Sequence, residues 1–171
     1  SISRYLIVDL QRGDTTEANH TFNTALMGSL ALILLLIPIA IMIAWFAPSF
    51  FSIGDTSWND VFILFLLIFG SALIRTWSSN FTQTLFAYNR LDLRNLVEII
   101  NISFQVGLII FLFYFISPSL IWVGVAYFVA ALLSLFSSVY FSKKIAQKLH
   151  FNPKLFQKKR LTEIGGIAIW S

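Results

Sequence analysis

The chain has 171 residues, of which 57% are hydrophobic and only 12% are charged, and its mean hydropathy is +0.79. So few charges cannot cover the surface of a soluble domain, so the composition predicts an integral membrane protein. The absence of cysteine excludes disulfides and thiolate metal sites, and the net charge of +4 does not indicate nucleic-acid binding because the positive residues lie between hydrophobic runs.

Four apolar stretches are long enough to cross a bilayer, whose hydrocarbon core of about 30 Å needs roughly 20 residues of helix. Their hydrophobic runs are continuous rather than alternating, which predicts helices and not the strands of a barrel. We therefore expect an all-α integral membrane protein, and we interpret the chain as an internal piece of a longer one. The predicted segments are an amphipathic cytoplasmic segment at 1–24, spans at about 25–46, 61–85, 96–116 and 119–141, a basic cytoplasmic linker at 142–164, and the start of a further helix at 165–171.

The positive residues predict how these spans are oriented. Lysine and arginine are found before the first span, between the second and third, and after the fourth, but not in the two other connections. The excess of positive charge in cytoplasmic loops predicts that both ends of the chain lie in the cytoplasm of a multi-pass membrane protein. Trp45, Trp58 and Trp122 fall near the predicted outer boundary, as expected for an aromatic belt.

The first span contains Pro38, in the stretch LLLIPIAIM. Proline removes one backbone hydrogen bond and kinks a helix. Pro38 is therefore a candidate hinge for a transporter, although such kinks are also found in membrane helices that do not move.

The second span carries a positive charge that an apolar helix does not need. Arg75 is followed by Ser79, Thr82 and Gln83 at helical offsets of 4, 7 and 8, so these side chains share one face. A cavity lined by this stripe is one interpretation, because charges inside a membrane usually face an interior or an aqueous cavity. The alternative is that the stripe packs against other helices, or that the Arg75 side chain extends to the cytoplasmic edge of the membrane, roughly 8 Å away.

The third span repeats the pattern with Arg94, Glu98, Asn101 and Gln105 at offsets of 0, 4, 7 and 11. Two neighbouring stripes of this kind predict a water-filled cavity open to the cytoplasm, in which Arg75 offers a fixed charge for a phosphate or carboxylate group. Glu98, four residues after Arg94, is expected to form a local salt bridge with it or to serve as an ion site. The fourth span has Gly124, Ala126, Ala130 and Ala131 followed by serines, which predicts a close-packing surface.

Three stretches resemble the polysaccharide flippases, the O-antigen and teichoic-acid exporters that are grouped with the multidrug and oligosaccharidyl-lipid exporters. They are SRYLIVDLQRGDTTEANHTFNTAL before the first span, LFAYNRLDLRNLVEIINISFQVGLIIFLF between the second and third, and the closing KKRLTEIGGIAIWS. The resemblance implies four helices from the first lobe of a two-lobed transporter with twelve to fourteen helices. It carries no motif that assigns a binding residue.

The resemblance also implies a function. Such a transporter would lie in the cell's inner (plasma) membrane. It would flip an undecaprenyl-diphosphate-linked glycan, the repeat unit of a cell-envelope polysaccharide such as lipopolysaccharide O-antigen, from the inner to the outer leaflet by alternating access. No cofactor, metal site or enzymatic activity is expected. Two other functions stay open: a cation-coupled multidrug exporter of similar fold, which needs a carboxylate deep in a span, and a non-transporting membrane scaffold subunit.

Overall fold

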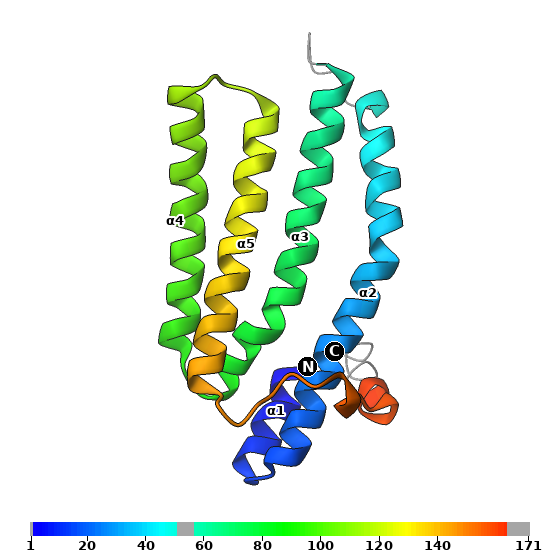
Figure 1. Ribbon diagram of the computed structural model, residues 1–171, viewed down its shortest axis with the longest axis vertical. Helices are drawn as coiled ribbons and strands as arrows, with labels where there is room; N and C mark the ends of the chain where they lie inside the picture. Colours follow the sequence, from blue (N-terminus) through cyan, green and yellow to red (C-terminus); the bar gives the residue numbers. More distant parts are fainter. Residues whose placement is uncertain (1, 51–56, 164–171) are drawn as a thin grey trace.

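The computed structural model describes residues 2–50 and 57–163, and within them the chain is helical throughout apart from its turns and connections. Four of the helices, α2 to α5, are long and apolar enough to cross a membrane. The predicted all-α membrane architecture is thereby confirmed. The elements shown in Figure 1 are α1 (Ile2–Gln11), α2 (Thr15–Phe50), α3 (Trp58–Ala87), α4 (Leu91–Phe115), α5 (Leu120–Ile145) and the short 3₁₀ helix η1 (Pro153–Leu155).

The predicted amphipathic segment 1–24 is not a separate helix, and the predicted boundary at residue 24 falls inside a continuous helix. Its second half belongs to α2, a helix of 36 residues, which at 1.5 Å per residue is about 54 Å long and exceeds a bilayer core of about 30 Å. Gly13 separates α1 from α2 with a φ of 73°, a conformation that glycine adopts without steric cost. Asp14 then caps α2, since its Oδ1 accepts from the backbone N–H groups of Thr16 and Glu17 at 3.1 and 3.0 Å.

The other helix ends follow local signals in the sequence. Ser57 and Ser119 cap α3 and α5, with their hydroxyls accepting from backbone N–H groups in the first turn. Asn89, with a φ of 56°, makes the tight turn from α3 to α4, in the left-handed region that asparagine tolerates better than most residues. α5 ends at Ile145 and so takes the first residues of the predicted linker 142–164, while the predicted helix start at 165–171 lies outside the described residues.

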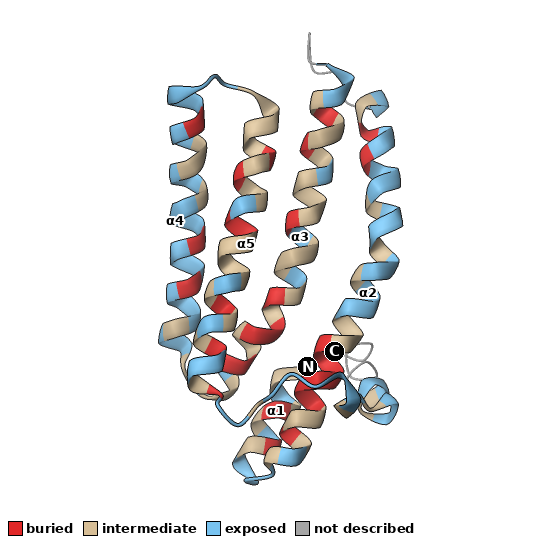
Figure 2. Ribbon diagram, in the orientation of Figure 1, coloured by how far each residue is buried: buried red, intermediate tan, exposed pale blue. Residues whose placement is uncertain are grey.

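The bundle is ordered so that α5 packs against both α3 and α4, whereas α3 and α4 meet each other over a much smaller area (Figure 1). The close-packing surface predicted on α5 is confirmed, because every buried residue of α5 is small: Gly124, Ala126, Ala130, Ala131, Ser138 and Ser142. Small side chains let two helices approach closely in a membrane, where van der Waals contact favours association. The sides of α2 and α4 that face away from the bundle carry mostly exposed apolar residues (Figure 2).

A second packed region, the headpiece, lies at one end of the bundle. It consists of α1, residues 15–26 of α2, and residues 146–163. Its core is a cluster of buried apolar side chains in which Phe22 of α2 meets Phe81 of α3 edge to face, with 5.9 Å between ring centroids. The cluster comprises Leu6, Ala18, Phe22, Leu26 and Phe81, and Figure 2 shows the concentration of buried positions where α1 crosses α2.

The segment after α5 returns across the headpiece and is held by side chains of α2. The side-chain Nδ2 of Asn19 donates to the carbonyl of Lys148 at 2.9 Å, and its Oδ1 accepts from the backbone N–H of His150 at 2.8 Å. One turn later, Nδ2 of Asn23 donates to the carbonyl of His150 at 2.8 Å and its Oδ1 accepts from the N–H of Asn152 at 2.7 Å. Because the two asparagines are four residues apart, they act from the same face of the helix.

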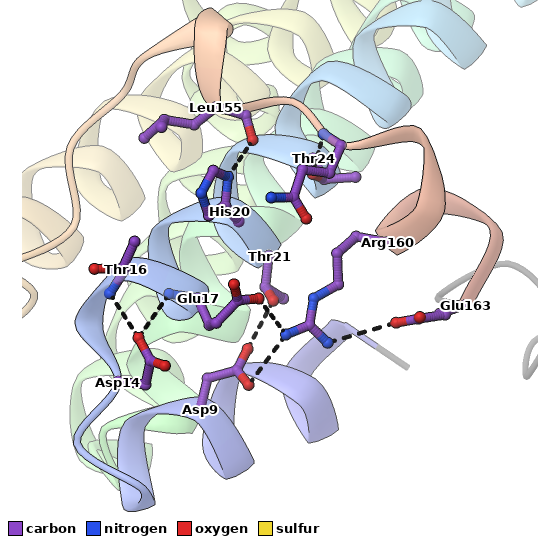
Figure 3. A network of polar contacts seen from close by, with 11 residues as sticks. Asp9, Asp14, Thr16, Glu17, His20, Thr21, Thr24, Leu155, Arg160 and Glu163 are labelled. Atoms are coloured by element: carbon purple, nitrogen blue, oxygen red, sulfur yellow. Dashed lines mark hydrogen bonds and ion pairs between the residues drawn. The ribbon is translucent and has the colours of Figure 1, made fainter.

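Two further side chains of α2 extend this attachment. Thr24 Oγ1 accepts from the backbone N–H of Gln157 at 3.0 Å. Nδ1 of His20 lies 2.9 Å from the carbonyl oxygen of Leu155, so the tautomer protonated at Nδ1 donates to it (Figure 3). We call Asn19, His20, Asn23 and Thr24 the α2 clasp. They satisfy the backbone of a segment that has no regular partner of its own.

Both α1 and the last described residues of the chain lie at the headpiece end (Figure 1). The turn from α3 to α4 and the end of α5 lie toward the same end, so the arginines and lysines of these segments gather there, as the charge pattern predicts. At the opposite end, Trp45 and Trp58 pack edge to face with 4.9 Å between ring centroids. The structure is thus a multi-pass arrangement, and the assignment of the headpiece end to the cytoplasm stays a prediction.

Candidate functional site

A cavity of about 210 Å³ opens between α3 and α4 toward the headpiece half of the bundle. Its walls come from one face of α3 and one face of α4, and Ser134 of α5 closes it between them. The stripes predicted on the two helices do meet here, and α5, which packs more extensively against α3 and α4 than they pack against each other, holds them at this spacing. The lining residues are Arg75, Ser78, Ser79, Thr82, Arg94, Val97, Glu98, Asn101 and Ser134.

Arg75 is the charged group that lies deepest along α3. From Arg75 to the helix end at Ala87 the rise is about 18 Å at 1.5 Å per residue. Its Nη2 donates to Oε1 of Gln105 on α4 at 2.6 Å, and its Cζ lies 5.9 Å from the ring centroid of Tyr127 on α5. All three spanning helices around the cavity therefore position this one side chain.

The contacts of Arg75 leave its charge uncompensated. Gln105 is a neutral acceptor, and the tyrosine ring offers only the weak attraction of an aromatic face for a cation. Among the described residues, the ion pairs do not include Arg75, and its buried Nε has no hydrogen-bond partner. A buried N–H group without a partner is costly, so a bound anion at this position would gain from pairing with it.

Asn101 adds a second unsatisfied group. It is 6% exposed, and its Oδ1 has no hydrogen-bond partner among the described residues. Arg75 and Asn101 are predicted site residues that line the cavity, and Gln105 supports it through Arg75 without lining it. A buried donor on one wall and a buried acceptor on the other indicate a site for a polar ligand or for ordered water.

The predicted salt bridge between Glu98 and Arg94 does not form. Both side chains are exposed and line the cavity, but the ion pairs of the described residues do not join them. The Arg94 guanidinium instead lies 5.7 Å from the ring centroid of Phe86, and the nearby ion pair is that of Arg90 with Asp92 at 2.8 Å. The spacing of four residues allows a salt bridge between Glu98 and Arg94, but in the structure the Arg94 guanidinium contacts the Phe86 ring of α3 instead.

The hydroxyl groups of the predicted stripe are largely used by their own helix. Ser79 donates to the carbonyl of Thr76 at 2.7 Å and Thr82 to the carbonyl of Ser79 at 3.0 Å. Such bonds satisfy the hydroxyl hydrogen while leaving oxygen lone pairs for a ligand donor. Gln83 is not among the lining residues. The prediction from its helical offset was therefore wrong, because Gln83 lies outside the part of the α3 surface that forms the cavity wall.

Ser78, Val97 and Ser134 line the cavity without having been predicted as site residues. Ser78 donates to Oγ of Ser138 on α5 at 3.1 Å, so it joins the α3–α5 packing surface to the cavity wall. The serines of α5 were interpreted as packing alone, because the sequence did not indicate that α5 separates α3 from α4. Pro38, the candidate hinge, lies on α2 within an unbroken helix and does not line the cavity.

The donors present do not suit a metal centre. Groups of three or more histidine, aspartate or glutamate side chains that would hold a metal ion do not occur in residues 2–50 and 57–163. The charged lining consists of two arginines and one glutamate, which favours an anion over a cation. Comparison of the chain with models of protein families, with curated proteins and with solved structures found no match.

Proposed function

We propose that this chain is part of a transporter that flips a lipid-diphosphate-linked oligosaccharide, the repeat unit of a polysaccharide, across the inner membrane by alternating access. One observation carries the proposal. Arg75, which lies on the apolar helix α3, lines the cavity, and its charge is not paired with a carboxylate of the described residues. The sequence resemblance to polysaccharide flippases supports the choice of substrate.

The chemistry of the cavity fits the charged part of that substrate. Arginine presents several N–H donors in a planar fork, which matches the oxygens of a phosphate better than an ammonium group does. The cavity of about 210 Å³ lies below the range of about 300–1,000 Å³ typical of pockets for whole small ligands. It is therefore suited to a phosphate or diphosphate group, and in this proposal the glycan and the isoprenoid chain lie outside it.

A scaffold subunit is the alternative that specific contacts favour. Ser78 and Ser138 join α3 to α5, and Ser79 bonds its own helix, as expected where polar residues only hold helices together. A cation-coupled multidrug exporter has less support, because it needs a carboxylate deep in a span. Asp60 lies in the first turn of α3, and Glu98 lies in the headpiece half of α4.

Cysteine labelling in the full-length protein distinguishes a transport cavity from a packing surface. The 171 residues contain no cysteine, so single cysteines at Ser79, Thr82 and Asn101 can be tested in inverted vesicles with a membrane-impermeant thiol reagent, with any cysteine elsewhere in the full chain first replaced. Leu73 and Leu108 provide controls on the apolar faces of the same two helices. Labelling of the three polar positions but not of the controls is expected. Equal protection of all five would rule out an aqueous cavity.

Substitution of Arg75 tests the substrate itself. Hydrogen bonds to a charged group contribute about 1.5–3 kcal/mol, so Arg75→Gln is expected to weaken substrate binding about 10- to 150-fold. Surface glycan should fall accordingly, with partial recovery in Arg75→Lys because the charge remains and the fork does not. The matched control is Arg90→Gln, which changes an arginine outside the cavity whose side chain is 43% exposed and paired with Asp92. Wild-type levels of surface glycan in Arg75→Gln at equal expression would contradict the proposal.

A further inference from the structure

A second cavity, of about 310 Å³, lies on the flank of α1 in the headpiece, away from the site between α3 and α4. Three of its six lining residues are arginines, and one is a carboxylate. Arg4 lies on α1, Arg12 lies in the turn that follows α1, and Arg160 comes from the last described residues, which the α2 clasp brings back beside α1. The lining residues are Arg4, Tyr5, Val8, Asp9, Arg12 and Arg160.

Arg160 is the arginine whose charge the protein already compensates. Its Nη2 lies 2.7 Å from Oε2 of Glu17 and 3.5 Å from Oδ1 of Asp9, and its Nη1 lies 3.5 Å from Oε2 of Glu163 (Figure 3). Its Cζ lies 5.7 Å from the ring centroid of Tyr5. Burial opposes the charged form, but the hydrogen bond to Glu17 and the nearby carboxylates raise the pKa of Arg160 above its ordinary value. It therefore forms a fixed wall of the cavity.

Asp9 contributes little free negative charge to the cavity. It is 5% exposed, its Oδ2 accepts from the hydroxyl of Thr21 at 2.7 Å, and its Oδ1 faces Arg160 (Figure 3). Both carboxylate oxygens are thus engaged by neighbours within the headpiece. The carboxylate that lines the cavity serves to hold Arg160 and α2 to α1.

Arg4 and Arg12 remain as the uncompensated charges. Both are exposed, and the ion pairs and side-chain hydrogen bonds of the described residues include neither of them. Arg12 is the first residue after α1, but its backbone N–H still donates to the carbonyl of Val8 at 3.1 Å, so the helical path continues to it. Arg4, Val8 and Arg12 follow one another at intervals of four residues, so they lie along the same side of α1, and the rise from Arg4 to Arg12 is about 12 Å. Long arginine side chains from these two positions can converge on a ligand held between them.

We propose that this cavity binds a phosphate-bearing anion, held by Arg4 and Arg12 against the wall formed by Arg160. Two separate guanidinium forks favour a ligand with several anionic oxygens, because each fork bonds two oxygens at once. The phosphate belongs either to the headgroup of an anionic lipid or to a soluble phosphate compound. This site is independent of Arg75 and of the transport function proposed above.

The test uses the purified full-length protein and two probes, inorganic pyrophosphate in detergent and nanodiscs of phosphatidylglycerol against phosphatidylcholine. Binding of pyrophosphate is measured by calorimetry, and stabilisation by lipid is measured as the shift in unfolding temperature. The double variant Arg4→Gln/Arg12→Gln is compared with Lys158→Gln/Lys159→Gln, which removes the same charge from exposed headpiece positions outside the cavity. All four side chains are exposed, so both variants are expected to fold.

Saturable pyrophosphate binding that weakens at least tenfold in the arginine variant alone would support a soluble ligand. A stabilisation by phosphatidylglycerol that is lost in the arginine variant alone would support a lipid headgroup. Substitution with lysine at both arginine positions should retain part of either effect, since the charge remains. Equal losses in the two double variants, or no response of the wild-type protein to either probe, would overturn the proposal.

Discussion

The α2 clasp predicts that one buried asparagine controls the mobility of a distant segment. Asn23 is fully buried, and it holds the linker through two hydrogen bonds, to the carbonyl of His150 and from the N–H of Asn152. Asn23→Ala removes both bonds. At about 0.5–1.5 kcal/mol for each bond, the closed form of the linker loses about 1–3 kcal/mol, which corresponds to an opening equilibrium about 5- to 150-fold more favourable.

Hydrogen exchange measured by mass spectrometry on the full-length protein checks this directly. Peptides covering residues 148–157 should exchange about 5- to 150-fold faster in Asn23→Ala, while peptides from α5 should not change. The matched control is Asn95→Ala on α4, an exposed asparagine outside the clasp. Unchanged exchange in 148–157 would refute the reasoning, because it would mean that the remaining clasp residues hold the linker without Asn23.

Two further predictions concern the interface between α3 and α5. Gly124→Leu is expected to destabilise the protein by about 1–3 kcal/mol, because a Cβ added at Gly124 would lie 3.1 Å from Cβ of Leu67. Gly107→Leu is the control and should not destabilise the protein, because a Cβ added there meets nothing within 4 Å. Equal unfolding temperatures of the two variants would contradict this prediction. A double-mutant cycle of Ser78→Ala and Ser138→Ala, measured by unfolding in detergent, should give a coupling of about 0.6 kcal/mol, and a coupling of zero would show that their 3.1 Å contact does not contribute.

The sequence alone determined the features that depend on short stretches of chain. Runs of about 20 apolar residues identified the four spanning helices, since the transfer of each run into lipid is a local property. The helical repeat placed Arg75 and Asn101 on faces that do line one cavity, because offsets of three, four and seven residues fix a face whatever packs against it. The small residues of α5 likewise indicated a packing surface before its partners were known.

Only the tertiary structure decided what these faces meet. The position of α5 between α3 and α4 brings Tyr127 to Arg75 and Ser134 to the cavity, while the Phe86 ring takes the contact with Arg94 expected for Glu98. The clasp joins Asn19 to residues near His150, far apart along the chain, so no periodic pattern indicates the pairing. Such contacts depend on which of many possible partners the complete fold brings close to a residue. The local sequence around that residue does not determine this choice.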